Sequence, residues 1–347
     1  MGLTSTASTL ATRRTLVFTS STTWTVPTSA LYVDVMVVGG GCGGQGGQGT
    51  SAGVGGYGGS GGAITTQKDI SLSGVSTVSI VVGAGSNGTV GGTTNAGLTP
   101  SQAGYSAFGT YVYSGGAFMN IGGMPAYKGT TNSPYGGNDS TGTNFAPILY
   151  TPIAPTATTT MVYPQLQNTA GSVSQGNSSQ RIIQGNSLDG TAIGSSGGWS
   201  GANASSGVAG IIGGIAGGAN ANSLNTSLYT ASQTLPWGAA SIFTLGTPTA
   251  GAVGGSAAGG LAGPIGYAGG GGGGGGSGGG FAGGLGANGA GGGGAGSSTT
   301  TGGAGGNAGT NTGSGGGGGG ATTGNGTGGA GGNGAAGFVI VSYIGTN

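Results

Sequence analysis

Alternating apolar and polar residues predict short β-strands at both ends of the chain. In residues 31–38, every second position from Leu31 to Val37 is apolar, and the run leads directly into glycine. Residues 338–344 are apolar on both faces, which is typical of a strand in the middle of a sheet. The other predicted strands are residues 16–20, 22–26, 63–72, 75–82 and 105–114.

These strands lead to three more specific expectations. The strand at residues 338–344 should pair with the N-terminal strands, which would bring the two ends of the chain together. Gly74 should form the turn between two strands, and residues 105–114 are predicted as one strand kinked at Phe108, beside Gly109. No segment has the apolar spacing of an α-helix.

A second pattern, with a period of three, fills residues 39–62. The second and third positions of nearly every triplet are Gly, and the first positions include Cys42, Gln45, Gln48, Ser51, Val54, Tyr57 and Ser60. This is the period of the left-handed polyproline II helix, which rises about 3.1 Å per residue. Two faces of such a helix would be bare backbone. An unbroken run would be about 75 Å long, so we expect the chain to reverse near residues 50–52.

Three other structures share some of these features. Collagen needs abundant imino acids, and no Pro lies between Thr28 and Thr99. A flexible glycine linker and irregular stacked loops are the remaining alternatives. An ordered chain with 97 Gly must satisfy its backbone polar groups internally. Polyglycine II helices that bond laterally to one another would do so, and we expect this arrangement.

Glycine content divides the chain into four regions. We interpret residues 1–15 as a polar arm, 16–117 as strands plus glycine, 118–254 as a long insertion of loops and short strands, and 255–347 as a second glycine-rich region. The insertion holds most of the 11 Pro, whereas GGAGGN occurs at both 302–307 and 328–333. The predicted fold class is therefore all-β. It comprises small antiparallel β-sandwich or sheet elements, packed polyglycine II helices and essentially no α-helix.

Formal charge is sparse, with 5 Lys and Arg against 4 Asp, a net charge of +1, and no His or Glu. Such a chain has no basic cluster for nucleic acid. No apolar run reaches the roughly 20 residues of a membrane span. Cys42 is the single cysteine, so an intrachain disulfide is impossible, and we expect it to be a small residue packed beside glycine.

The residue types also argue against catalysis. Hydrolysis of glycans needs a carboxylate pair, but Asp34 and Asp69 fall in predicted strands, and Asp139 and Asp189 in predicted turns. Without His, Ser-His and Cys-His catalysis are excluded, and zinc loses its commonest nitrogen ligand. We therefore expect no enzyme activity, no catalytic residues, no metal site and no cofactor.

Several short motifs occur in a fixed order. They are LVFTS at 16–20, WTVP at 24–27, LYVDVMVVGGG at 31–41, VSIVVGAG at 78–85, SAFG at 106–109 and GAAGFVIVSY at 334–343. Together they resemble the glycine-rich domain of bacteriophage tail fibre and tail adhesin proteins, over about residues 16–117 and 255–344. The near absence of Lys and of Glu departs from that family, and the central region has no counterpart in it.

The resemblance implies a non-enzymatic virion component, part of a tail fibre or a receptor-binding tip exposed to the extracellular medium. Its implied partners are other phage tail or fibre proteins and a host cell-surface receptor, either glycan or protein. A homotrimer is possible because fibres are commonly trimeric. Loop aromatics of the central region are the candidate receptor contacts, although each could instead fill a local core. They are Tyr127, Tyr135, Trp199, Tyr229 and Trp237.

Two other functions remain open. An ice-binding protein built of polyglycine II helices would present a flat face of Thr or Ala. The repeat of residues 39–62 instead carries Gln45, Gln48, Val54 and Tyr57 on its side-chain face, which argues against this function. A silk-like or cell-surface structural protein would have long uniform repeats, whereas this chain is heterogeneous and is bracketed by defined strands.

Overall fold

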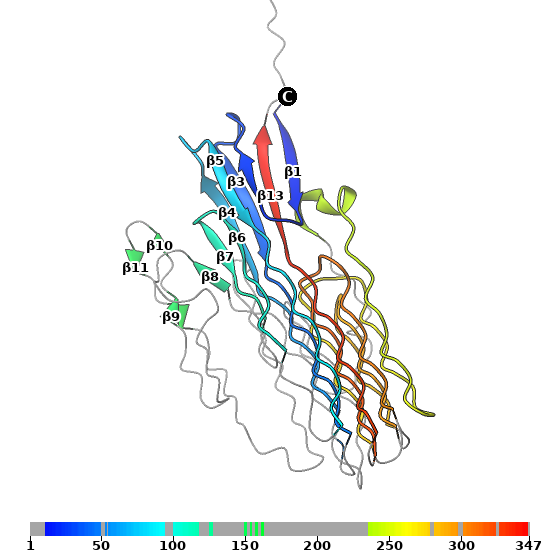
Figure 1. The fold of residues 1–347 in the computed structure, drawn as a ribbon. Coiled ribbons are helices and arrows are strands. Elements are labelled where there is room, and N and C mark those ends of the chain that lie inside the picture. The colour runs from blue at the N-terminus through cyan, green and yellow to red at the C-terminus, as the bar shows by residue number, and fades with distance from the viewer. Residues whose placement is uncertain are drawn as a thin grey trace, which may run out of the picture.

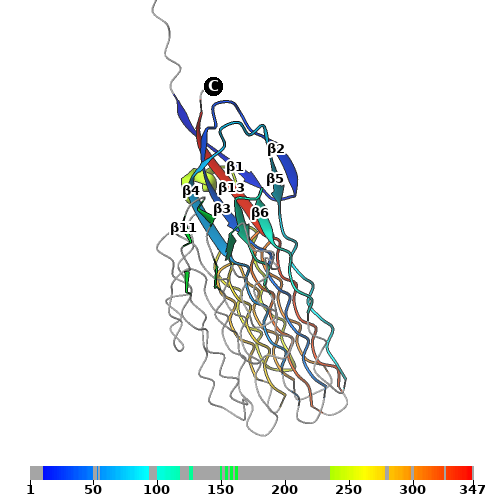
Figure 2. The same cartoon turned by 90° about the vertical axis from the view of Figure 1, so that its left-hand side faces the viewer.

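Two β-sheets form one end of the molecule, and a bundle of glycine-rich segments extends from them (Figure 1). Viewed from the side, the same segments run next to one another along the bundle (Figure 2). The computed structural model describes residues 11–49, 53, 55–93, 100–117, 235–277, 281–297, 301–323 and 326–345, and the backbone of the short strands β8 to β12.

The first sheet has four antiparallel strands in the order β1-β13-β3-β4. They are β1 (Thr12–Phe18), β13 (Phe338–Gly345), β3 (Tyr32–Val38) and β4 (Ile64–Ser71). The last strand lies between two N-terminal strands, with Val341 opposite Leu16 on one side and Val35 on the other. This confirms the expected pairing of the two chain ends. It also explains why residues 338–344 are apolar on both faces.

The second sheet has the order β2-β5-β6-β7-β8. Its strands are β2 (Thr22–Thr25), β5 (Thr77–Val81), β6 (Ser106–Phe108), β7 (Val112–Ser114) and β8 (Pro125–Tyr127). The two sheets share a buried core in which Trp24 lies 6.1 Å from Phe108 and 6.0 Å from Tyr343, measured between ring centroids. These large rings bury apolar area together with the Val, Ile and Leu side chains of the same core, which stabilises this end of the molecule.

A second core covers the other face of the four-stranded sheet. The segment that contains the 3-10 helix η2 (Pro236–Ser241) packs on Phe338, Ile340 and Met36. The ring of Phe338 contacts Phe243 at 5.7 Å and Tyr267 at 5.8 Å between centroids. The four-stranded sheet is therefore enclosed on both sides, with the five-stranded sheet on one face and the η2 segment on the other.

The glycine-rich segments bond to one another through their backbones, and we call this set of segments the lattice. Successive hydrogen bonds between two segments are three residues apart: the N–H groups of Gly41, Gly44 and Gly47 donate to residues 335, 332 and 329. A spacing of three matches the three residues per turn of polyglycine II. Among the described lattice glycines, positive φ occurs only at the turn positions Gly255, Gly289 and Gly313, so the helices are left-handed.

The bonding pattern arranges the lattice in three layers. The outer layer comprises residues 83–93, 326–337, 301–309 and 245–254, in that order. The middle layer comprises residues 39–49, 313–322, 290–297 and 257–265. The third layer comprises residues 55–63, 268–277 and 281–288. Segments 39–49 and 55–63 are antiparallel, since Cys42 donates to the carbonyl of Ser60 and Gln45 to that of Tyr57. The chain therefore reverses between the two segments, as expected.

The structure departs from the sequence expectations in three places. First, β1 begins at Thr12, inside the region interpreted as an arm. Second, residues 105–114 form two strands, because Gly109 has a left-handed φ of 53° and turns the chain after Phe108. Third, residues 245–254 belong to the lattice rather than to the insertion, since Ala252 donates to the carbonyl of Ala304.

Within the insertion, short strand pairs are described by their backbone alone. They are β9 (Leu149–Tyr150) with β12 (Met161–Val162), and β10 (Ile153–Ala154) with β11 (Ala157–Thr158).

Candidate functional site

The centre of the lattice is residues 313–322, which we call the central helix; every one of its residues is buried. Three successive N–H groups, of Gly318, Gly319 and Gly320, donate to carbonyls of three different segments, each at 2.8 Å. The acceptors are Gly272, Gln45 and Gly303. Its carbonyls also accept from three segments in turn: that of Gly319 from segment 55–63, that of Gly320 from 326–337 and that of Ala321 from 290–297. The central helix is therefore bonded on all sides.

Close approach of these backbones explains the run of six glycines from Gly315 to Gly320. A Cβ added at Gly318 would lie closer than 3.0 Å to the carbonyl oxygen of Gly56, and one at Gly319 would similarly meet Gly329. One at Gly320 would meet Ala295. Because three successive residues face three different neighbours, no position from Gly315 to Gly320 tolerates a side chain. A helix with fewer neighbours needs fewer glycines. This accounts for the other lattice segments, in which about every third residue carries a side chain.

The outer layer carries one set of side chains on the side away from the middle layer, whereas Ser86 and Thr89 face the middle layer and accept from the N–H groups of Gly43 and Gly46. These outward residues recur every third position, are exposed, carry no formal charge, and define what we call the open face. They are Ala84, Asn87, Val90, Thr93, Thr327, Ala330, Asn333, Thr301, Ala304, Asn307, Thr310, Thr247, Ala250 and Val253. Sequence reasoning did not single these residues out. The signal for them was TGGAGGN, which occurs at both 301–307 and 327–333.

The side-chain positions of residues 39–62 lie elsewhere. Cys42 and Gln45 are buried, and Gln48 and Tyr57 are half-buried, so they do not form the open face. Val54 lies outside the described residues. Gln45, Gln48 and Tyr57, on which the expectation against ice binding rests, therefore lie away from the exposed open face.

Hydrogen bonds link three of the Asn and Thr side chains across the outer layer. The Oδ1 atom of Asn307 accepts from the N–H of Asn333 at 2.8 Å, and Asn333 Oδ1 accepts from the N–H of Gly88 at 2.9 Å. On the other side, Thr249 Oγ1 accepts from the N–H of Asn307 at 2.7 Å. One row of side chains therefore joins all four segments of the layer. These bonds satisfy outward-facing N–H groups that have no further layer to bond.

Cys42 is fully buried in the lattice. Its thiol lies 3.7 Å from the carbonyl of Ser101 and 3.5 Å from the hydroxyl of Ser86. Burial raises the pKa of Cys42 to about 11, an effect that its hydrogen bonds to Ser86 and Ser60 only partly offset. The thiol is therefore protonated at neutral pH, so it is a poor nucleophile.

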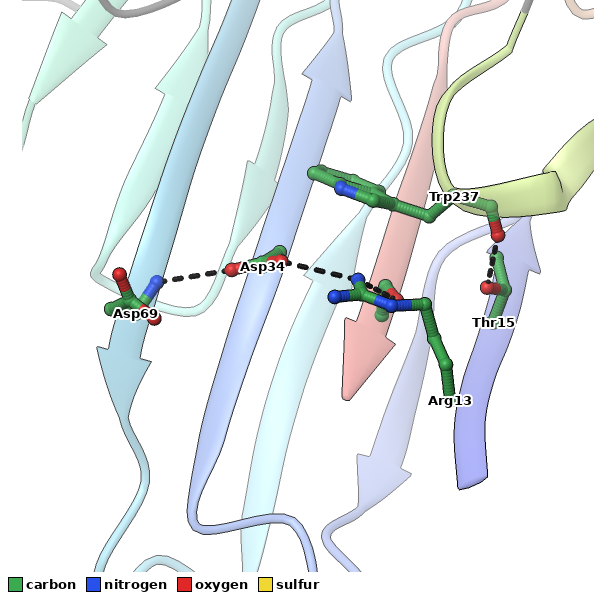
Figure 3. A network of polar contacts seen from close by, with 6 residues as sticks. Arg13, Thr15, Asp34, Asp69 and Trp237 are labelled. Atoms are coloured by element: carbon green, nitrogen blue, oxygen red, sulfur yellow. Dashed lines mark hydrogen bonds and ion pairs between the residues drawn. The ribbon is translucent and has the colours of Figure 1, made fainter. Parts of the chain in front are cut away.

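The other polar cluster lies on the four-stranded sheet (Figure 3). Arg13 Nη1 lies 3.3 Å from Asp34 Oδ2 and donates to the Ser342 hydroxyl at 3.0 Å. Asp34 Oδ1 accepts from the N–H of Asp69 at 3.2 Å, where a bulge in β4 leaves that N–H without a ladder partner. Folding thus brings Asp34 and Asp69 together, with the Asp34 carboxylate bonded to Arg13 and to the bulge.

Of the candidate receptor contacts, Trp237 is the one whose side chain is described. It is half-buried against the second core, and its carbonyl accepts from Thr15 Oγ1 at 2.7 Å (Figure 3). Its left-handed φ of 53° is uncommon for a bulky residue. Tyr127 lies in β8, where only the backbone is described, and Tyr135, Trp199 and Tyr229 lie outside the described residues. Of these five residues, the structure therefore places the side chain of Trp237 alone, against the second core.

Within the described part of the chain, no three His, Cys, Asp or Glu side chains gather where they could hold a metal ion. A helix long and apolar enough to cross a bilayer is likewise absent from the described residues. Comparison with protein-family models and with curated proteins finds no match to this chain.

Proposed function

We propose that this chain is a non-enzymatic structural protein of a bacteriophage tail fibre, or of its receptor-binding tip. The observation that carries the proposal is the elongated lattice, whose segments are each bonded to several neighbours. Strands β1 and β13 lie at the sheet end, and the glycine-rich segments extend from it toward the opposite end of the molecule (Figure 1). A rod built this way can be anchored at one end while it presents loops at the other.

The distribution of charge supports the same orientation. Every charged residue that the structure describes lies on the four-stranded sheet: Arg13, Arg14, Asp34, Lys68 and Asp69. The described lattice is neutral and has no tryptic site. We assign the charged sheet end to contacts with other tail proteins, because charged groups give an interface its specificity. The far end faces the host receptor, a glycan or a protein. A neutral, backbone-bonded rod suits exposure to proteases.

Labelling of virions tests this assignment. Fab fragments raised against the sheet end would be applied to particles of the phage that encodes the chain, and imaged by electron microscopy. We expect the label on the tail appendage, and label on the capsid or on no particle would contradict the proposal. Purified folded chain should also reduce adsorption of that phage to its host cells. Heat-denatured chain is the control and should have no effect.

The open face favours ice binding as a second candidate function. It is uncharged, its rows of Asn, Ala and Thr repeat every third residue, and its segments lie side by side in one layer. An ice-binding chain would lower the freezing point below the melting point. Replacing Ala330 with Arg would place a large charge on this face and abolish the effect, whereas Ala282→Arg, at an exposed position of the third layer, would not. Absence of thermal hysteresis in the wild-type chain would exclude this function.

A further inference from the structure

The lattice ends at the outer layer, since no described segment forms a fourth layer beyond it. In the central helix of the middle layer, residues 315–320 are all Gly, so backbones of the neighbouring layers approach closely and bond, as Gly317 does to Gly306. In the outer layer, the positions that would face a fourth layer carry Ala, Asn, Thr or Val instead. The outer-layer segments therefore place mostly glycine against the middle layer and side chains toward solvent.

Backbone donors remain exposed behind these side chains. No described residue accepts a hydrogen bond from the N–H of Ala304 or of Ala330. Both residues are exposed, and most other N–H groups of their segments bond neighbouring segments, as those of Gly305 and Gly331 do. These two exposed donors resemble those on the edge strand of a β-sheet, which invites pairing with another chain.

Steric exclusion prevents this pairing. Between adjacent lattice segments, a Cβ added at Gly329 would lie closer than 3.0 Å to the carbonyl of Gly303, and one at Gly303 would similarly meet Ala252. A Cβ that already stands on the open face holds an incoming glycine helix away by the same geometry. At the level of the Asn row, the side chains of Asn307 and Asn333 also occupy the N–H groups.

We propose that the outward side chains of the open face terminate the lattice, and that the partner they exclude is the same face of a second copy of this chain. A second copy is the partner that fits, because its outer layer has the same helix spacing and is equally uncharged. Two bare faces could bond as two layers do within one molecule. This inference rests on the lattice and not on the proposed role in a virion.

The test removes the side chains and measures association. In the variant T301G/A304G/T327G/A330G, two bare segments face solvent, and light scattering after size exclusion should give at least twice the wild-type mass. The matched control T301S/A304S/T327S/A330S keeps every Cβ and should retain the wild-type mass. Restoring Ala330 in the glycine variant should also reverse the association.

Three outcomes would overturn the proposal. One is a glycine variant that folds and keeps the wild-type mass. Another is a wild-type chain whose self-association is lost on Ala330→Arg, because the open face would then already be an interface. If the fourfold variant fails to fold, A304G/A330G decides between the alternatives. Loss of folding in that variant too would count against the proposal, because the proposal gives the methyl groups of Ala304 and Ala330 no role in holding the layer together.

Discussion

Asn307 Oδ1 accepts a hydrogen bond at 2.8 Å from the backbone N–H of Asn333, its counterpart in the second copy of the repeated TGGAGGN sequence. The two segments run parallel, with Thr301 bridged to Thr327 and Gly305 donating to the carbonyl of Ala330. The repeat therefore places identical residues side by side. Its Asn is a lateral link that fixes the register of two neighbouring helices.

Replacing Asn307 with Ala should lower the free energy of unfolding by about 1 kcal/mol, the ordinary net value of one hydrogen bond. The N–H of Asn333 would keep water as a partner because the row is exposed, so the loss should not be larger. Asn307→Asp retains the acceptor oxygen and should lose less than half as much. Urea unfolding followed by tryptophan fluorescence measures both. Equal losses in the two variants would show that the link is not the hydrogen bond.

Replacing Gly318 with Ala should cost more than about 3 kcal/mol, because its Cβ would collide with the backbone of Gly56 rather than with a flexible side chain. Ala330→Ser on the open face is the matched control and should change stability by less than about 0.5 kcal/mol. Thermal unfolding of both variants is the measurement. A mild effect at Gly318 would mean that the central helix is less tightly enclosed than its bonding indicates.

Sequence reasoning succeeded where one local pattern determines the structure. The strand at residues 338–344 is apolar on both faces because β13 lies between β1 and β3, with one core on each side. Period-three glycine likewise predicted laterally bonded helices. It failed for residues 105–114, where the pattern continues across Gly109 and the positive φ of that glycine alone makes the turn.

The open face could not be predicted because the sequence does not say which helices become neighbours. The triplets of residues 39–62 show a side-chain face, but whether that face is buried depends on the segments packed against it. Gln45 is 7% exposed because it lies in the middle layer. The side chains of residues 301–309 follow the same period and are exposed, because their layer is the last. The repeated TGGAGGN was the one local signal that two segments are neighbours, because its two copies place Asn307 beside Asn333.

Alkaline pH should weaken the fold through Cys42. The unfolded thiol loses its proton near the ordinary pKa of 9.0, whereas the folded thiol keeps it up to about pH 11. The unfolded state therefore binds fewer protons in this window, and the free energy of unfolding falls as pH rises from 9 to 11, by at most about 1.4 kcal/mol per pH unit. Below pH 9 this contribution is constant.

Comparison with Cys42→Ala isolates the thiol from other groups. Burial also raises the pKa of Tyr267, so its ionisation weakens the fold in the same direction at high pH. Urea unfolding at pH 8 and pH 10 should therefore show a larger drop for the wild-type chain than for Cys42→Ala. Equal drops would show that the thiol is not protected by burial. Rapid alkylation of the native thiol by iodoacetamide at pH 7 would lead to the same conclusion.

Hydrogen exchange should separate the central helix from the open face. The amides of residues 315–320 are buried and bonded, so they should exchange only when the lattice opens as a whole. The amides of Ala304 and Ala330 donate to no described residue and should exchange orders of magnitude faster. This contrast requires an ordered lattice, since a flexible glycine chain would give uniformly fast exchange. Fast exchange in both sets would refute the rigid rod, and with it the anchored fibre component and the terminated lattice.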